Sequence, residues 1–203
     1  MTGGVLVNIL KLGDIAEVST GLVVKRKEAA SLELAKKTYK MLTLKSFDSE
    51  GWLNESDLDS FNSSEFLEDK YLTGEGDVIV RLSAPYTAIT VDSSHGGFLI
   101  PSLFAVIRLG AKEFLSEFLA LYLNSPQMKK EYTKSSSGSA IQTLKISDFK
   151  EFEIKLLPLE EQKKVIDVNS VLKREKYLLL KLLEQNEIRN KEILKTLLNG
   201  ERK

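Results

Sequence analysis

The last part of the sequence, residues 159–199, has the pattern of one uninterrupted helix, about 60 Å long at about 1.5 Å per residue. Apolar residues recur along it at alternating spacings of three and four, the repeat of a coiled coil. The seam that they form consists of Val165, Val168, Leu172, Leu179, Leu182 and Ile193, and Asn186 lies on the same line. A helix this long extends beyond a small domain, so the seam past Leu179 needs another helix to cover it, although the first two turns could pack on their own domain. Asn186 would set the register of such a pair at a cost in stability.

Pro158 marks the start of this helix. A proline is tolerated in the first helical turn, where its missing N–H would have had no partner, and Glu160 and Glu161 place negative charge where a helix N-terminus favours it. We therefore divide the chain into a globular domain, residues 1–157, and a long helix, residues 158–203.

The globular part predicts a mixed domain of fold class α+β. Alternating or β-branched runs that indicate strands occupy residues 39–45, 78–82, 87–91, 98–109 and 152–157. Helical periodicity occupies residues 112–123, 126–132 and 141–149. Short turns between successive strands favour antiparallel neighbours. Residues 55–69 are acidic and rich in Ser and Asn, and we expect a surface segment with short helical turns there.

The composition supports a packed core, since 42% of the 203 residues are hydrophobic. There is no cysteine, which excludes disulfides and thiolate metal sites and agrees with a reducing cytoplasm. No apolar run approaches the roughly 18 to 20 residues that span a bilayer, and the N-terminal stretch lacks the basic lead of a signal peptide. We therefore expect a cytoplasmic protein with no membrane partner.

The charge balance is unusual for a nucleic-acid-binding protein. The chain has 29 Lys and Arg residues against 29 Asp and Glu, and residues 1–159 carry 18 basic and 21 acidic side chains. A DNA-binding domain is expected to be basic. Any DNA surface is therefore a local patch with weak nonspecific affinity, and a coiled-coil interaction protein without a DNA role stays open as an alternative.

Motifs for catalysis or cofactor binding are scarce. His95 is the only histidine, residues 74–76 are G-x-G without the third glycine of a dinucleotide loop, and no G-x-x-x-x-G-K-[ST] phosphate loop occurs. The methyltransferase signatures N-P-P-F and D-P-P-Y do not occur either. We expect no cofactor and no metal.

Asp148, Glu153 and Lys155 imitate the acid and E-x-K group with which many nucleases hold Mg²⁺. Strand alternation, however, places Glu153 and Lys155 on a solvent face, opposite Phe152 and Ile154, and short motifs often match by chance. We favour the solvent-face interpretation and keep a Mg²⁺-dependent nuclease as an alternative function.

Three stretches of the chain carry a resemblance to a known family. They are LGDIAEVSTG at residues 12–21, LTGEGDVIV at residues 72–80 and GSAIQTLKISDFKEFEIKLLPLEEQ at residues 138–162. In order and spacing they resemble the specificity (S) subunit of type I restriction-modification enzymes, over roughly residues 10–199. The third stretch is the most specific, because a Gly-Asp turn before a strand is common.

The resemblance implies a division of roles between domain and helix. Such subunits carry target recognition domains, each followed by a long conserved helix, and usually two of each, whereas this chain has one of each. It implies that the chain performs no catalysis and reads one half of a split target on double-stranded DNA. It also implies docking of methyltransferase (M) subunits, with the restriction (R) subunit as a further partner.

Two copies of the chain, paired antiparallel through their long helices, would imitate the two-domain subunit. A homodimer of this kind requires a palindromic split target because its interface is two-fold symmetric. Pairing with a different half subunit would give an asymmetric target.

Three segments are candidate DNA contacts, and the first follows Gly21. Lys25, Arg26 and Lys27 form a basic run that suits phosphate groups. A charge run is also common on a solvated face, so both interpretations stay open.

The second segment lies where an expected strand loses its apolar run. It contains Arg81, Ser83 and Tyr86. Arginine suits bidentate contact with guanine, and tyrosine suits phosphate contact or stacking. Arg81 could equally pair with Asp77 or Asp92.

The third segment, residues 132–145, is the one that we favour. Its polar members are Lys134, Ser137, Ser139, Gln142, Thr143 and Lys145. Small hydroxyl residues let the backbone approach a phosphate, and Gln142 can bridge the donor and the acceptor of an adenine edge. The alternative is a plain flexible linker in which Gln142 caps a turn.

Overall fold

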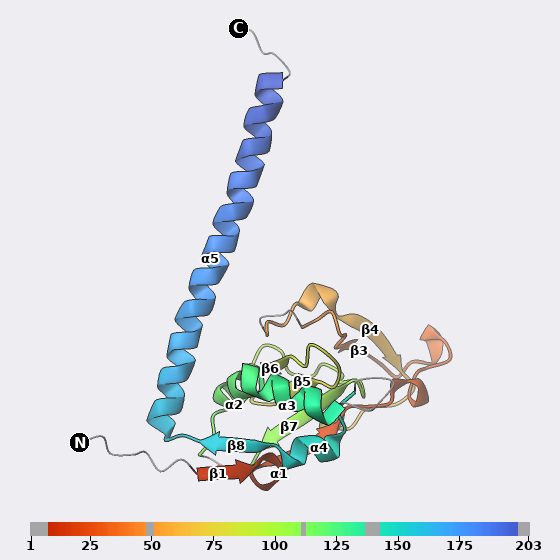
Figure 1. Cartoon of the computed structure of the whole chain (residues 1–203). Helices are drawn as coiled ribbons and strands as arrows, with labels where there is room; N and C mark the ends of the chain where they lie inside the picture. The colour runs from red at the N-terminus through yellow and green to blue at the C-terminus, as the bar shows by residue number, and fades with distance from the viewer. Residues whose placement is uncertain (1–7, 48–50, 111–112, 137–142, 199–203) are drawn as a thin grey trace, which may run out of the picture. The chain divides into compact units, whose positions relative to one another are not determined.

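The computed structural model describes residues 8–47, 51–110, 113–136 and 143–198. The chain forms two compact units, residues 1–162 and residues 163–203. The first unit contains all the strands of the described residues, and the second continues the long C-terminal helix (Figure 1).

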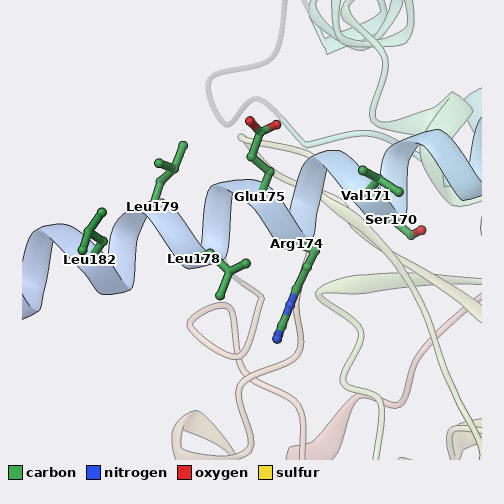
Figure 2. Close-up of a pocket in the computed structure, with 7 residues that line it drawn as sticks. All are labelled: Ser170, Val171, Arg174, Glu175, Leu178, Leu179 and Leu182. Atoms are coloured by element: carbon green, nitrogen blue, oxygen red, sulfur yellow. The ribbon is translucent and has the colours of Figure 1, made fainter.

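The long helix, α5 (Leu159–Leu198), is uninterrupted, which confirms the helical pattern of the sequence. Its predicted seam is exposed, and Leu179 and Leu182 are each 55% exposed. A groove on the helix is lined by Ser170, Val171, Arg174, Glu175, Leu178, Leu179 and Leu182 (Figure 2). The exposed apolar side chains of α5 are therefore available where a partner helix could pack.

Among the described residues, no helix combines the length and the apolar character needed to cross a membrane.

A four-stranded antiparallel sheet lies at the centre of the first unit. Its strands, in spatial order, are β2 (Ala16–Thr20), β7 (Phe104–Leu109), β5 (Val78–Arg81) and β6 (Ala88–Thr90). The expected antiparallel pairing of successive strands is confirmed for β5 and β6, while β7 pairs with the other edge of β5. Val78, Ile79 and Val80 are fully buried, as their continuous apolar run indicated.

Two further strand pairs belong to the same unit. They are β1 (Asn8–Lys11) with β8 (Glu153–Leu156) and β3 (Lys37–Met41) with β4 (Asp59–Ser63), both antiparallel. Strand β8 confirms the alternation seen before Pro158. Figure 1 shows β1 and β8 side by side, so the first described residues pair with the segment that leads into α5.

Strand β4 corrects the expectation of short helical turns throughout residues 55–69. Only Glu55–Asp57 and Asp69–Tyr71 form 3-10 turns there. Between them, Phe61 is buried and pairs with Tyr39 across the ladder. One buried aromatic residue and a distant partner strand thus decide the structure of a segment whose local composition is that of a surface loop.

Four short α-helices complete the first unit, with single 3-10 turns at Val24–Arg26 and Leu32–Leu34. They are α1 (Leu12–Ile15), α2 (Ser116–Leu123), α3 (Pro126–Ser136) and α4 (Ile146–Glu151). Helices α2 and α4 both begin later than the periodicity predicts. The N–H of Leu115 donates to the side chain of Gln162 at 2.8 Å, and the N–H of Leu144 donates to the carbonyl of Leu82 at 2.9 Å. Both amides are engaged by distant residues, and Leu115 and Lys145, the residues directly before the two helices, are extended.

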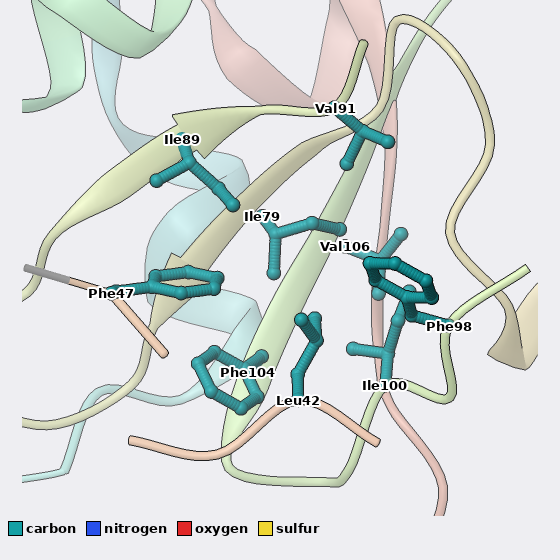
Figure 3. Close-up of a cluster of buried hydrophobic side chains, with 9 residues drawn as sticks. All are labelled: Leu42, Phe47, Ile79, Ile89, Val91, Phe98, Ile100, Phe104 and Val106. Carbon is teal, nitrogen blue, oxygen red and sulfur yellow. The ribbon is translucent and has the colours of Figure 1, made fainter. Parts of the chain in front are cut away.

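The main hydrophobic cluster joins the sheet to the loops beside it. Figure 3 shows its nine buried side chains pointing toward one another, and they are Leu42, Phe47, Ile79, Ile89, Val91, Phe98, Ile100, Phe104 and Val106. The rings of Phe47 and Phe104 pack with their centroids 4.9 Å apart. This core holds β5 and β6 in place, and with them the turn that connects them.

Gln162 connects the first turn of α5 to its unit, and its side chain is fully buried. Its amide nitrogen donates to the carbonyls of Glu113 and Leu157, at 2.6 and 2.8 Å. Its amide oxygen accepts the N–H of Leu115 described above. A buried amide is costly unless both of its ends are hydrogen-bonded, and here both are. The compact unit therefore extends past Pro158 as far as Gln162.

We expect Gln162→Leu to lower the free energy of unfolding of the globular unit by about 1–3 kcal/mol, because three backbone groups lose their partner. Urea unfolding of the full chain would measure this. The matched control is Gln127→Leu on α3, where the same change at an exposed position should stay within about 0.5 kcal/mol of the wild type. Equal effects of the two variants would show that the buried amide contributes nothing to stability.

Candidate functional site

The turn after β5, residues 83–86, is the centre of the candidate site. The N–H of Tyr86 donates to the carbonyl of Ser83 at 2.9 Å, and the Ala84–Pro85 peptide bond is cis. Tyr86 has a φ of 55°, a left-handed value that a non-glycine residue adopts only with support from its surroundings. That support includes Tyr132, whose ring centroid lies 5.4 Å from that of Tyr86. The core therefore holds this turn in one shape.

The structure brings two of the three predicted DNA-contact segments together at this turn. Ser83 forms an antiparallel β-bridge with Thr143, and the neighbouring N–H of Leu144 donates to Leu82. Thr143 and Lys145 are exposed, and Ser83 is half-buried. Residues from the end of β5 and from the start of the segment before α4 thus share one surface.

The side chain of Arg81, the last residue of β5, contacts the turn. Its two terminal nitrogens donate to the carbonyls of Leu44 and Ala84, both at 3.1 Å. Its Nε is buried and is hydrogen-bonded to nothing among the described residues. Burial lowers the pKa of Arg81. Among the described residues, the guanidinium is thus held by neutral carbonyls and by no carboxylate.

The two acids considered as partners of Arg81 are occupied elsewhere, so that alternative was wrong. Asp77 accepts hydrogen bonds from Arg108, with the closest contact at 3.0 Å. Asp92 lies 2.7 Å from His95 within its own turn. Arg108 is on the neighbouring strand β7, so its pairing with Asp77 could not be read from local spacing.

Lys129 on α3 is a second cation at the same turn, and the sequence reasoning missed it. Its Nζ donates to the carbonyls of Pro85 and Tyr86, both at 2.6 Å. Burial, together with the nearby charge of Arg81, lowers the pKa of Lys129 to about 8. In the described part of the chain, no ion pair joins either cation to a carboxylate. The only local signal was a Lys129–Lys130 pair on a predicted helix, which does not distinguish a half-buried lysine from an exposed one.

Asn124 fixes the end of α2 against the edge strand β6. Its side-chain oxygen accepts the N–H of Ala88 at 2.9 Å, and its side-chain nitrogen donates to the carbonyl of Ala88 at 2.7 Å. The amide therefore imitates a neighbouring strand. Because α3 begins two residues later, this pairing also positions the helix that carries Lys129.

A group of aromatic rings, on α3, on α4 and directly after α4, packs together in the same region. Tyr132 packs against Phe149 and Phe152, with centroid separations of 5.8 and 5.2 Å. The hydroxyl of Tyr132 donates to the carbonyl of Leu123 at 3.0 Å. Burial raises the pKa of Tyr132, so the ring stays neutral. Helices α2, α3 and α4 are thus tied together behind the turn.

The remaining predicted contacts lie in different places. Tyr86 is only 5% exposed, so its ring belongs to the core and we leave it out of the proposed surface. Lys25 and Arg26 are exposed, while Lys27 pairs with Glu65 at 2.6 Å and accepts the N–H of Ser64, directly after β4, with its carbonyl. Lys134 is exposed on α3 and lies 2.7 Å from Glu131. The predictions for Ser137, Ser139 and Gln142 fall outside the described residues.

The nuclease-like group occupies the positions that alternation predicted. Glu153 and Lys155 are exposed on β8, while Phe152 and Ile154 are buried. Asp148 accepts the N–H of Lys145 at 3.2 Å and so serves as a cap of α4. Across the described residues, no group of three or more acidic or histidine side chains has the arrangement of a metal site.

We expect Asn124→Ala to lower the free energy of unfolding by about 1–3 kcal/mol, because both backbone groups of Ala88 lose their partner. Hydrogen exchange at the Ala88 amide should accelerate as well. Asn190→Ala, at an exposed position of α5, is the control and should change neither quantity by a comparable amount. Unchanged exchange at Ala88 in the first variant would contradict the role assigned to Asn124.

A model of one protein family matches most of the chain. The family is described as the type I restriction modification DNA specificity domain, and the match covers residues 5–190. A comparison with curated proteins gave no match.

Solved structures of type I systems share the fold. The HsdS subunit from Thermoanaerobacter tengcongensis aligns with a TM-score of 0.65 at 19% identity, over 96% of this chain and 50% of that one. The S subunit from M. genitalium aligns with a TM-score of 0.57 at 17% identity, over 95% and 46%. A chain from a study of complex assembly and conformational transition of the type I R-M system aligns with a TM-score of 0.63 at 15% identity, over 95% and 45%. This chain thus spans about half the length of each solved chain, and by its sequence match it belongs to the family of type I restriction modification DNA specificity domains.

Proposed function

We propose that the chain is a non-catalytic specificity subunit that reads one half of a split DNA target and docks methyltransferase subunits. The observation that carries this proposal is the family match across residues 5–190, which includes both the globular unit and most of α5. The DNA-facing surface that we propose is the one around the turn, with Arg81, Ser83, Thr143 and Lys145. The small size of this surface agrees with a domain that carries no overall positive charge.

Helix α5 supports the second part of the proposal, which is pairing with another copy of the chain. Its apolar seam is exposed over most of its length, and a groove runs beside it at residues 170–182 (Figure 2). An exposed apolar stripe on a long helix is stabilised when an equivalent helix covers it. We take the partner helix to be antiparallel α5 from a second copy.

Three polar residues, Glu175, Asn186 and Arg189, continue the three-four spacing of the seam, and one antiparallel register pairs two of them. When the two-fold axis passes between Leu179 and Leu182, Leu179 of one copy faces Leu182 of the other. The same register sets Glu175 against Asn186 of the partner copy, so a carboxylate meets an amide donor. Registers that slide by one heptad set Glu175 and Asn186 each against an apolar side chain, which leaves both without a partner.

The nuclease alternative receives no support from the geometry, because Glu153 and Lys155 lie on an exposed strand face and Asp148 caps a helix. The alternative of a coiled-coil protein without a DNA role agrees with α5 but does not account for the family match to a DNA specificity domain.

The target prediction follows from the two-fold symmetry. We expect the chain, mixed with its methyltransferase subunit, to retain from a pool of randomised duplexes sequences with two half-sites in inverted orientation at a constant spacing. Sequencing of the retained pool would show this. A pool without any enriched sequence would refute DNA recognition, whereas enriched half-sites without inverted symmetry would refute only the homodimer.

The pairing prediction tests the apolar seam of α5 in the full chain. We expect light scattering to give twice the chain mass of 22.8 kDa for the wild type, and the single mass for the double variant Leu179→Glu with Leu182→Glu. The paired helices would bury four carboxylates at the two-fold axis, and buried charges without partners would oppose the pairing.

The matched control for this pairing is Leu180→Glu, since Leu180 is 56% exposed, almost the same as Leu179, but points away from the seam. It should remain a dimer. A monomeric wild type, or equal dissociation of the seam and control variants, would contradict the proposed interface.

A further inference from the structure

Two positive side chains converge on one short turn from different elements. Arg81 at the end of β5 donates to the carbonyl of Ala84, and Lys129 on α3 donates to the next two carbonyls, of Pro85 and Tyr86. Their charges are close enough that Arg81 lowers the pKa of Lys129. Both side chains are half-buried, so solvent screens this repulsion only in part.

A purely structural role does not explain two charges at this position. Carbonyl groups are neutral acceptors, and a neutral donor could satisfy them without the cost of burying a charge. Asp77 and Asp92, the acids considered as partners of Arg81, are engaged with Arg108 and His95, and Glu131, two residues from Lys129, lies 2.7 Å from Lys134. The Nε of Arg81 is buried and is hydrogen-bonded to no described residue. Among the described residues the cluster therefore has surplus positive charge, and each terminal nitrogen of Arg81 has an N–H beyond its one carbonyl contact, which an anion would complement.

We propose that Arg81 and Lys129 form a binding site for one phosphate of the DNA backbone, with the hydroxyls of Ser83 and Thr143 at its margin. This rests on the proposed function and adds to it a residue, Lys129, and a role for the turn. Backbone phosphates are bound by Arg, Lys and hydroxyl donors together, and such contacts fix the position of a protein on the duplex without reading sequence. Held at a rigid turn, the cluster anchors the adjacent exposed residues Thr143 and Lys145 over the DNA.

We expect DNA binding at this site to depend on pH as well as on salt concentration. The side chains facing Lys129 from the packed elements are Arg81, Asn124 and Tyr132, and the ring centroid of Tyr132 lies 5.8 Å from Nζ. Among them only Arg81 is charged, because burial keeps Tyr132 protonated. Lys129 loses its proton as pH rises through about 8, and the neutral amine binds phosphate less well. Affinity for DNA should therefore fall across that range.

The test is binding of the full chain to a labelled duplex of random sequence, measured by fluorescence anisotropy at several KCl concentrations. For Lys129→Gln we expect the slope of log affinity against log salt to become shallower by about 0.9, which is about an eightfold loss at about 0.1 M salt. The matched control, Lys130→Gln, removes the same charge from an exposed neighbour on α3 and should lose distinctly less.

A third variant, Lys129→Arg, separates charge from structure. It keeps the positive charge at all relevant pH values, so it should keep the salt slope of the wild type but lose the fall in affinity above about pH 8. Urea unfolding of each variant would show whether the turn remains folded. Loss of binding in both Lys129 variants, with the stability unchanged, would contradict a charge-based contact.

The outcomes also separate this inference from the proposed function. A wild-type chain that binds no duplex at any salt concentration would refute the proposed function, and the phosphate site with it. A wild-type chain that binds, together with a Lys129→Gln variant that matches Lys130→Gln in slope and pH dependence, would refute only the phosphate site.

Discussion

The buried amide of Gln162 is the interaction on which the organisation of this chain depends. It satisfies backbone groups at Glu113, Leu115 and Leu157, and so ends the globular unit and begins the free part of α5. Because a buried amide with missing partners is costly, the three segments are held together by one side chain. In the proposed function this matters directly, since α5 sets the distance between two recognition domains and each domain must be attached to its helix in a defined way.

The turn at residues 83–86 shows how a small domain without net positive charge can still present a site for an anion. Core packing through Tyr86 and Tyr132 fixes its shape, and Asn124 positions the helix that brings Lys129 to it. The charges are few, but they are half-buried and without a carboxylate among the described residues. A buried charge acts over a longer range than an exposed one, so two such cations can contribute more than the overall composition suggests.

The apolar seam of α5 and the cationic turn have a common property: each is costly as long as it lacks a partner. Exposed leucines favour another helix, and unneutralised cations favour an anion. A chain that carries both is suited to work in an assembly, and the proposed dimer on DNA would satisfy the two at once. The rest of the surface can stay balanced in charge, because in this proposal a few positions are enough to bind the two partners.

The sequence by itself determined the elements whose signals are local. The periodicity of residues 159–199, the apolar run of β5 and the alternation around Ile154 each identified an element before any tertiary information, and Pro158 located the start of α5 to within one residue. The tertiary structure alone decided what depends on partners distant in the chain. It made a strand of β4 through Phe61 and Tyr39, paired Asp77 with Arg108 instead of Arg81, buried Tyr86 and brought Lys129 to the turn. The reason is physical: helix and strand propensities act between near neighbours, whereas burial and ion pairing are decided by whichever residues the fold brings into contact.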